Sequence, residues 1–354
     1  MANALESELS YPFGDTLPAQ GRTLSVADGV HWLRMRLPFA LDHINLWLLR
    51  DRQDGRDGWT VVDCGIDDAP TRAAWEEVFA TGLQGLPVLR VICTHMHPDH
   101  IGLAHWLTER WSCRLWISAT DWNAARVASS AIGDAHSGDS AADFYARHGL
   151  NDAVALERLR RRSNVYASMV RQVPAQFRRL MDGMRLRIGA HEWRCIAGYG
   201  HAPEHIALFC PALNLLISGD MVLPRISTNI SVYDIEPEAN PLPLYLDSIR
   251  AMRAALPADA LVLPSHGKPF GGLHPRIDQL LAHHDERFAE VLKACAEAPH
   301  TAAELLPLLF KRELDMHQTT FALGEAVAHV HALQAEGQLR QLPMADGVLR
   351  YAAA

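Results

Sequence analysis

The sequence predicts an α/β protein in which strands and helices alternate in layers, with a helical insertion and a small, mainly helical domain at the end. Strand-like and helix-like runs alternate between residues 23 and 118, the alternation stops at 119–181, and it returns at 186–263. Because 354 residues exceed one average domain, we expect a main domain at 1–275 and a C-terminal domain at 276–354.

Apolar runs of strand length define the expected sheets. In the first part of the chain, strands are predicted at 31–37, 44–49, 59–62, 88–93 and 113–117, with helices at 69–85 and 102–110. After the insertion, strands are predicted at 186–188, 192–196, 206–209, 215–218 and 261–263. This order is typical of an α/β layered domain.

The insertion at 119–181 is polar and rich in alanine and arginine. We expect helices and one mobile loop here, which makes the segment a candidate lid. Its Arg158–Arg162 run is more typical of a solvated helix face than of a nucleic-acid site. Tyr145, Arg147 and His148 could reach a substrate from above, although isolated residues in such a segment are more often structural.

The C-terminal part is predicted to be mainly helical. Helices are expected at 277–296, 301–310 and 319–336, followed by a β-ribbon at 337–342 and 347–351. Three helices and a hairpin are typical of a winged-helix module, which often binds DNA. Residues 301–354 hold four basic and six acidic side chains, a net charge of −2, so we favour a role in packing or in forming a homodimer.

Charge and composition narrow the classes of function. Lys plus Arg number 33 against 41 Asp plus Glu, a net charge of −8, so no global positive field collects nucleic acid or anionic membranes. The sequence shows no signal peptide and no run of about 18 apolar residues, which predicts a cytoplasmic protein without membrane contact. Six cysteines without Cys-x-x-Cys spacing predict buried thiols.

Four side chains that can bind metal follow the predicted strand 88–93 within one turn: His95, His97, Asp99 and His100. His95 and His97 are two residues apart, so in extended backbone both imidazoles point the same way and one metal could take both. Asp99 and His100 stand where a helix begins and can address a second metal a few ångströms away. Asp99 alone could be a helix N-cap, but four such residues together indicate a metal site.

Further candidate ligands lie near the ends of later predicted strands. His201 stands in a glycine-flanked loop, Asp220 follows Ser218-Gly219, and His266 precedes Gly267. The predicted set is His95, His97 and His201 for one metal, Asp99, His100 and His266 for the other, with Asp220 bridging the two. Neutral imidazoles and carboxylates suit Zn²⁺, Mn²⁺ or Fe²⁺.

The set His-x-His-x-Asp-His, Gly-His, Gly-Asp and Ser-His-Gly, which runs from His95 to Gly267, resembles the metallo-β-lactamase superfamily. The resemblance implies an αββα sandwich with a two-metal site at one edge of the paired sheets, and zinc is the expected metal. The loop Ile226–Val232, the His283-His284 pair before Arg287, the Leu216–Asp220 motif and the winged-helix-like tail are similar to the lactamase-beta-2-like proteins.

Two divalent metal ions would lower the pKa of a shared water until hydroxide forms near neutral pH, and would polarise the bond under attack. Asp220 would fix the separation of the metals and Asp99 could accept a proton from the water, so both are predicted catalytic residues. Asp63 could orient a ligand imidazole or simply initiate a turn. His205 is either a supporting residue of the site or a core histidine.

The leading hypothesis is hydrolysis of a small ester-like substrate, a thioester or a lactone. The alternative is a metal-dependent nuclease or phosphodiesterase acting on RNA, since some lactamase-beta-2-like proteins cleave RNA and the Arg158–Arg162 run could hold phosphates. Persulfide dioxygenases share the expected fold, and a DNA-binding regulator is the non-enzyme alternative. No tyrosine shortly follows Asp220 as in acyl-homoserine lactonases, and no export signal is present as in most β-lactamases.

Overall fold

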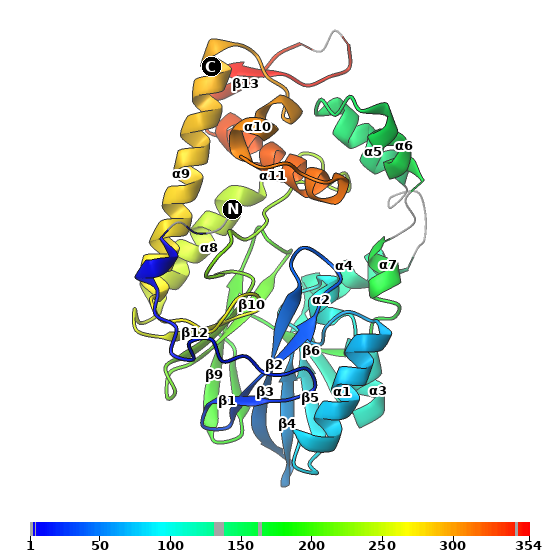
Figure 1. Cartoon of the computed structure of the whole chain (residues 1–354), viewed down its shortest axis with the longest axis vertical. Helices are drawn as coiled ribbons and strands as arrows, with labels where there is room; N and C mark the ends of the chain where they lie inside the picture. Colours follow the sequence, from blue (N-terminus) through cyan, green and yellow to red (C-terminus); the bar gives the residue numbers. More distant parts are fainter. Residues whose placement is uncertain (1–2, 4, 131–137, 162–164, 344–345) are drawn as a thin grey trace.

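Two β-sheets lie at the centre of the computed structural model, which describes residues 3, 5–130, 138–161, 165–343 and 346–354 (Figure 1). The strands of the seven-stranded sheet follow chain order: β1 (Leu24–Ala27), β2 (Val30–Arg36), β3 (His43–Gln53), β4 (Arg56–Val62), β5 (Val88–Ile92), β6 (Arg114–Ser118) and β7 (Phe177–Leu180). The five-stranded sheet has the order β12 (Leu261–Pro264), β11 (Leu215–Gly219), β10 (His205–Cys210), β9 (His191–Gly198) and β8 (Arg185–Ile188).

Helices cover the outer faces of both sheets (Figure 1). Those of the first half and the insertion are η1 (Glu6–Glu8), α1 (Ala69–Thr81), α2 (Pro98–Ile101), α3 (Ala104–Trp111), α4 (Ala119–Ser129), α5 (Gly138–Arg147), α6 (Ala153–Arg160) and α7 (Val165–Met169). Those of the second half are α8 (Pro241–Ala255), α9 (Leu273–Glu297), η3 (Ala303–Leu305), α10 (Leu306–Leu309) and α11 (Met316–Ala335), and the chain closes with β13 (Leu339–Gln341) and β14 (Tyr351–Ala353).

Alternating side chains bind the four layers together. In β3, Trp47 faces the inner core shared with Ile206 of β10, whereas its neighbour Leu48 belongs to the outer core under α1 and α3. In β10 the next residue along, Ala207, packs instead toward α8 and α9. Because successive side chains of a strand point to opposite faces, each sheet is buried on both sides. The predicted αββα sandwich is confirmed.

The long helix α9 runs from the five-stranded sheet to the C-terminal ribbon (Figure 1). A capping box between Asp315 and Gln318 starts α11, and β13 pairs antiparallel with β14 as the sequence predicts. The proposed domain boundary at 276 falls inside α9 and stays a prediction, as does the winged-helix assignment. Five of the six cysteines are buried and all six are free. Across the described residues, every helix is too short or too polar to cross a bilayer.

Three elements differ from the sequence prediction. The insertion does not stay helical to residue 181, because β7 pairs parallel with β6 at its end; the two exposed arginines of Phe177–Leu180 conceal the apolar pattern. Helix α8 was not predicted, since its first turn contains Pro241 and Pro243, which are tolerated only there. The expected helix 301–310 is reduced to η3 and α10, with Pro307 in the first turn of α10.

Helix α5 of the insertion packs against the C-terminal part instead of facing a substrate. Tyr145 and His148 are buried, and the backbone carbonyls of Arg147 and His148 accept hydrogen bonds from the amides of Leu349 and Ala303. These contacts favour a structural role for Tyr145, Arg147 and His148. The sequence predicts no bounds for the mobile loop of the insertion, and residues 131–137 and 162–164 of this segment, Arg162 among them, lie outside the described residues.

Candidate metal centre

The predicted ligands converge at one edge of the two sheets because each follows the end of a strand. His95 and His97 come after β5, and His97 is the N-cap residue of α2, which carries Asp99 and His100. His201 lies between β9 and β10, Asp220 follows β11 and His266 follows β12. Since β11 and β12 are parallel neighbours, their carboxyl ends meet at the same edge.

The first group contains His95, His97, His201 and Asp220, whose candidate ligand atoms all lie within 4.8 Å of one another. His95 Nε2 is 2.9 Å from His97 Nδ1 and 3.2 Å from His201 Nε2. A tetrahedral metal with bonds of about 2.1 Å separates its ligands by about 3.4 Å. The spacing of the three imidazoles is close to that of ligands of one ion.

The second group contains Asp99, His100 and His266, also with ligand atoms within 4.8 Å of one another. Asp99 Oδ2 is 3.4 Å from His266 Nε2 and 3.7 Å from His100 Nε2. These separations again match neighbouring ligands of one ion. The structure thus brings all seven predicted residues together in two neighbouring groups; that they bind two metals stays a prediction.

Asp220 lies between the two groups. Its Oδ2 is 3.3 Å from His201 Nε2 and 3.5 Å from His100 Nε2, and its Oδ1 is 3.5 Å from His266 Nε2. Asp220 Oδ1 and His100 Nε2 are buried and lack hydrogen-bond partners among the described residues. Unpaired buried polar atoms are costly, and a cation between them would satisfy both. The donor set therefore fits divalent metal ions.

Outer contacts fix the imidazole tautomers. The carbonyl of Asn229 is 2.8 Å from His201 Nδ1, and the carbonyl of His43 is 2.8 Å from His266 Nδ1. A carbonyl can only accept, so each Nδ1 carries a proton, and Nε2 is the nitrogen that can offer a lone pair to a metal once it has no proton of its own. Such partners orient metal-binding histidines in general. Because every residue has a backbone carbonyl, the sequence does not indicate which carbonyls take this role.

Asp63 contacts the ligand His100. Its Oδ2 is 2.8 Å from His100 Nδ1, while its Oδ1 accepts a 2.8 Å hydrogen bond from the amide of Thr94. Asp63 has a left-handed backbone with φ of +61°, so the turn interpretation holds together with the orienting one. Asp63 therefore both turns the chain after β4 and orients the imidazole of His100.

His205 and Gly219 support Asp220 from behind. The amide of Asp220 donates to His205 Nε2 at 3.2 Å, and burial lowers the pKa of His205, which keeps the ring neutral and able to accept. A Cβ on Gly219 would lie 2.1 Å from that same nitrogen, and Gly219 has φ of +54°. The His205 ring packed against position 219 therefore requires glycine directly before Asp220.

Asp121 is a residue of the site that the sequence analysis missed. It is buried at the start of α4, where its two carboxylate oxygens accept hydrogen bonds from the amides of Met96 and Glu204, at 2.8 and 2.7 Å. It therefore ties the histidine turn to the His201 loop. Its place four residues after the end of the predicted strand 113–117 was the available signal.

The candidate ligands differ in their protonation. Burial, with neighbouring imidazoles, lowers the pKa of His95, and burial with His201 lowers that of His97 to about 3, so both rings are neutral. Burial opposes ionisation of Asp99, but His100 and His266 lower its pKa to about 2. Against burial, Asp220 and Asp99 raise the pKa of His266 to about 10. A metal that binds His266 must therefore displace a proton.

Comparison with known families gives two matches along the chain. The model described as metallo-beta-lactamase superfamily matches residues 40–266, and one described as metallo-beta-lactamase-like, C-terminal domain, matches residues 288–354. The first covers all the candidate ligands and more than half of the chain. The second begins inside α9.

Relatives match over nearly the whole chain. A crystal structure of a beta-lactamase domain protein from Burkholderia ambifaria is 55% identical, with a TM-score of 0.94, over 99% of this chain and 100% of that one. The metallo-beta-lactamase family protein TTHA1429 from Thermus thermophilus is 26% identical, with a TM-score of 0.74, over 93% and 100% of the two chains. The probable metallo-hydrolase YqjP of Bacillus subtilis (strain 168) is 24% identical over 86% of this chain and 92% of its own. The chain belongs to the metallo-β-lactamase superfamily.

Proposed function

We propose that this protein is a binuclear metal-dependent hydrolase of a small ester-like substrate, a thioester or a lactone. The observation that carries the proposal is the position of Asp220, whose two oxygens lie within 3.5 Å of imidazole nitrogens from both ligand groups. A carboxylate so placed can be shared by two ions. The Bacillus relative is described as a probable metallo-hydrolase, which supports the same class of reaction.

Bound divalent metals would supply Lewis acidity and a water of lowered pKa. Within the chain, His95, His97 and His201 would hold one ion, Asp99, His100 and His266 the other, and Asp220 both. Asp99 is the partly exposed member of the second group, so its carboxylate can both bind an ion and accept a proton from an entering water. Zinc is our expected metal because imidazole and carboxylate ligands suit it.

Two of the described arginines of the Arg158–Arg162 run are already paired, which argues against the nuclease alternative. Arg160 pairs with Asp143 at 3.4 Å and Arg161 with Glu157 at 2.7 Å, on the exposed side of α6. Side chains already paired with carboxylates offer phosphates less positive charge. A small uncharged reaction centre remains the better match to a protein of net charge −8.

The test begins with metal analysis of protein purified without chelator, followed by a panel of thioesters, lactones and RNA phosphodiesters at two salt concentrations. We expect two metal equivalents and hydrolysis of at least one ester class with little response to salt. RNA cleavage that weakens steeply with salt would replace the proposal by the nuclease. A single bound iron with oxygen consumption on persulfides would replace it by redox chemistry.

A further inference from the structure

The loop that follows Asp220 contacts two of the seven candidate ligands. The hydroxyl of Thr228 donates a hydrogen bond to the Asp220 carbonyl, and the Asn229 carbonyl lies 2.8 Å from His201 Nδ1. We call residues 226–232 the Asn229 loop. Because this loop contacts Asp220 and orients the His201 imidazole, whatever fixes the loop also fixes part of the metal centre.

Helix α11 packs against the Asn229 loop through one of its faces. The amide of Val232 donates to the Gly324 carbonyl at 3.1 Å, and Ser231 Oγ lies 3.3 Å from the Phe321 carbonyl. Phe321 and Gly324 are three residues apart, so they share a helical face. The Ser231 hydroxyl also donates to Asn229 Oδ1 at 2.8 Å. A continuous set of contacts therefore joins α11 to the residue whose carbonyl orients His201.

Gly324 is the residue that lets α11 approach the loop so closely. It lies in the interior of α11, where glycine is less favourable than alanine, so packing must account for it. A Cβ at position 324 would lie 2.8 Å from Ser231 Cβ and 3.0 Å from both Ser231 Oγ and the Val232 carbonyl oxygen. Carbon atoms in contact are about 3.5–4.0 Å apart, so Ser231 would have to move by roughly 1 Å.

Both sides of this contact are packed. Leu323 and Val327 of α11 are wholly buried in one core with α8 and α9, and Ile230 of the loop is buried in the same core. The start of the loop is held by Arg276 of α9, whose Nη2 donates to the Ile226 carbonyl at 2.8 Å. Because a packed core transmits strain, a methyl group added at position 324 would displace the loop.

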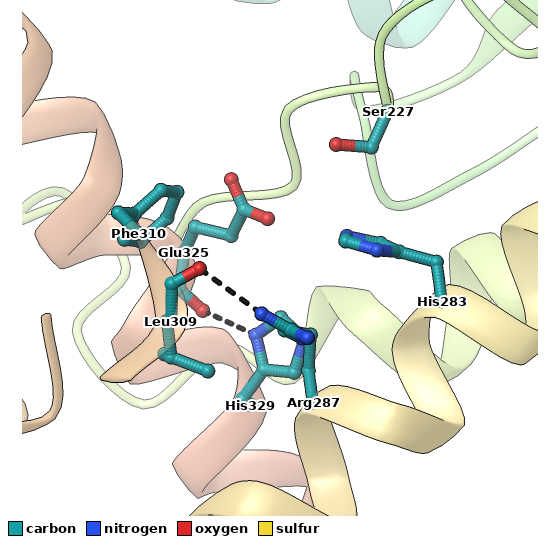
Figure 2. Close-up of a pocket in the computed structure, with 7 residues that line it drawn as sticks. All are labelled: Ser227, His283, Arg287, Leu309, Phe310, Glu325 and His329. Atoms are coloured by element: carbon teal, nitrogen blue, oxygen red, sulfur yellow. Dashed lines mark hydrogen bonds between the residues drawn. The ribbon is translucent and has the colours of Figure 1, made fainter. Parts of the chain in front are cut away.

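The space beside the loop is too small to receive a displaced side chain. Figure 2 shows Ser227 of the loop, Glu325 of α11 and His283 of α9 pointing toward this space. It has room for about one water. The displacement caused by a larger residue at position 324 is therefore expected to reach Asn229, two residues before Ser231.

We propose that Gly324 is a positioning residue of the metal centre. By admitting the Asn229 loop against α11, it holds the Asn229 carbonyl where that carbonyl orients His201. Helix α11 thus contributes to metal affinity, although none of the candidate ligands found among the described residues lies on it. The inference rests on the proposed function in one step only, that the centre binds metal, and it is independent of the substrate.

The test measures metal affinity in the wild type and in Gly324→Ala, by competition for Zn²⁺ against a chromophoric chelator. His97→Ala, which lacks a ligand of the first group, identifies the binding constant of that group. We expect Gly324→Ala to weaken this constant by at least about tenfold, as outer-shell changes do, and the other constant to fall less. Alanine is the better helix former, so without a positioning role it would only raise the melting temperature. An unchanged constant overturns the inference, whichever way the melting temperature moves.

Two further variants separate positioning from general damage to α11. Gln334→Ala changes an exposed residue nearer the end of the helix and should leave both constants unchanged. Ser231→Gly removes the two atoms nearest to a methyl group at position 324. In that background, Gly324→Ala should therefore weaken the first constant less than it does alone. An equal loss in both backgrounds would contradict the role of the contact with Ser231, and the inference with it.

Ser231→Ala offers a milder test should Gly324→Ala fail to fold. It keeps Cβ and removes only the hydroxyl that donates to Asn229 Oδ1. We expect the first constant to weaken several-fold, because a loop residue next to the centre loses a hydrogen bond that fixes it. A first constant equal to that of the wild type would overturn the inference.

The same titrations separate this inference from the proposed function. If no ester is hydrolysed but the first constant falls in Gly324→Ala and not in Gln334→Ala, the positioning role stands and the hydrolase proposal fails. If esters are hydrolysed and metal affinity does not respond to Gly324→Ala, the hydrolase stands and the positioning role fails. A wild type that binds one ion refutes the binuclear site, and the inference then requires the constant of that ion to fall in Gly324→Ala.

Discussion

Replacing Asp63 by asparagine should weaken one metal site and spare the other. Asparagine has the same shape and tolerates the left-handed backbone at this position, φ +61°. However, the carboxylate accepts from both His100 Nδ1 and the Thr94 amide at 2.8 Å, and asparagine has only one accepting oxygen. One buried donor would lose its partner, which costs about 1–3 kcal/mol.

This loss should appear as metal affinity because Asp63 orients His100. Outer-shell substitutions of this kind weaken metal binding by about 10- to 100-fold, which is about 1.4–2.7 kcal/mol. Competition against a chromophoric chelator would resolve two binding constants in the wild type. In Asp63→Asn only one should fall, since His95, His97 and His201 do not contact Asp63 in any hydrogen bond found among the described residues.

The matched control is Asp152→Asn, because Asp152 is the exposed N-cap residue of α6, where asparagine caps equally well. It should leave both constants unchanged. Equal weakening of the two sites in Asp63→Asn would show that the ligands do not divide as we describe. No weakening at all would remove the orienting role of Asp63.

The remaining predictions concern the ligands and stability. His97→Ala should lose one metal equivalent and Asp220→Ala should weaken both, each lowering activity by more than about 100-fold, as metal analysis and turnover would reveal. Asp51→Ala should cost about 3–5 kcal/mol in urea unfolding, because it leaves the buried Arg90 guanidinium, now 2.8 Å from Asp51, without its partner. The folded pKa of Glu325 is about 7 against 4.5, so its stabilisation is complete below pH 4.5 and about 3 kcal/mol is lost as pH rises through 7. Glu325→Gln should remove that dependence between pH 5 and 8, and an unchanged profile by thermal melting would contradict the assignment.

The ligand set could be predicted from sequence because its signal is local. Each candidate follows an apolar run that can only be a buried strand, and strand ends of layered sheets gather at one edge. Thus His201, Asp220 and His266, separated by long stretches of chain, could be assigned with His95 before any contact was known. The same runs predicted an α/β layered domain, and the family resemblance of the ligand motifs implied the αββα arrangement of its layers.

What the sequence could not provide depends on contacts between distant segments. The carbonyls of Asn229 and His43 that orient two ligands are invisible in any side-chain pattern, because every residue has a carbonyl. Helix α8 was concealed by its prolines, and β7 by two consecutive exposed arginines, which an edge strand tolerates. Asp121 looks like an ordinary helix-capping residue until Met96 and Glu204 are seen on either side of it.

The candidate metal ligands occupy only part of this chain. Every candidate ligand lies at or before His266, and the superfamily match ends at residue 266. Helices α9 and α11 lie wholly beyond that limit. A ligand motif can therefore predict the centre yet say nothing of the substrate. The loop from Asp220 to Asn229 links the centre to these helices, because the Asn229 carbonyl lies 2.8 Å from His201 Nδ1 and Asn229 Nδ2 lies 3.5 Å from Glu325 Oε2 of α11.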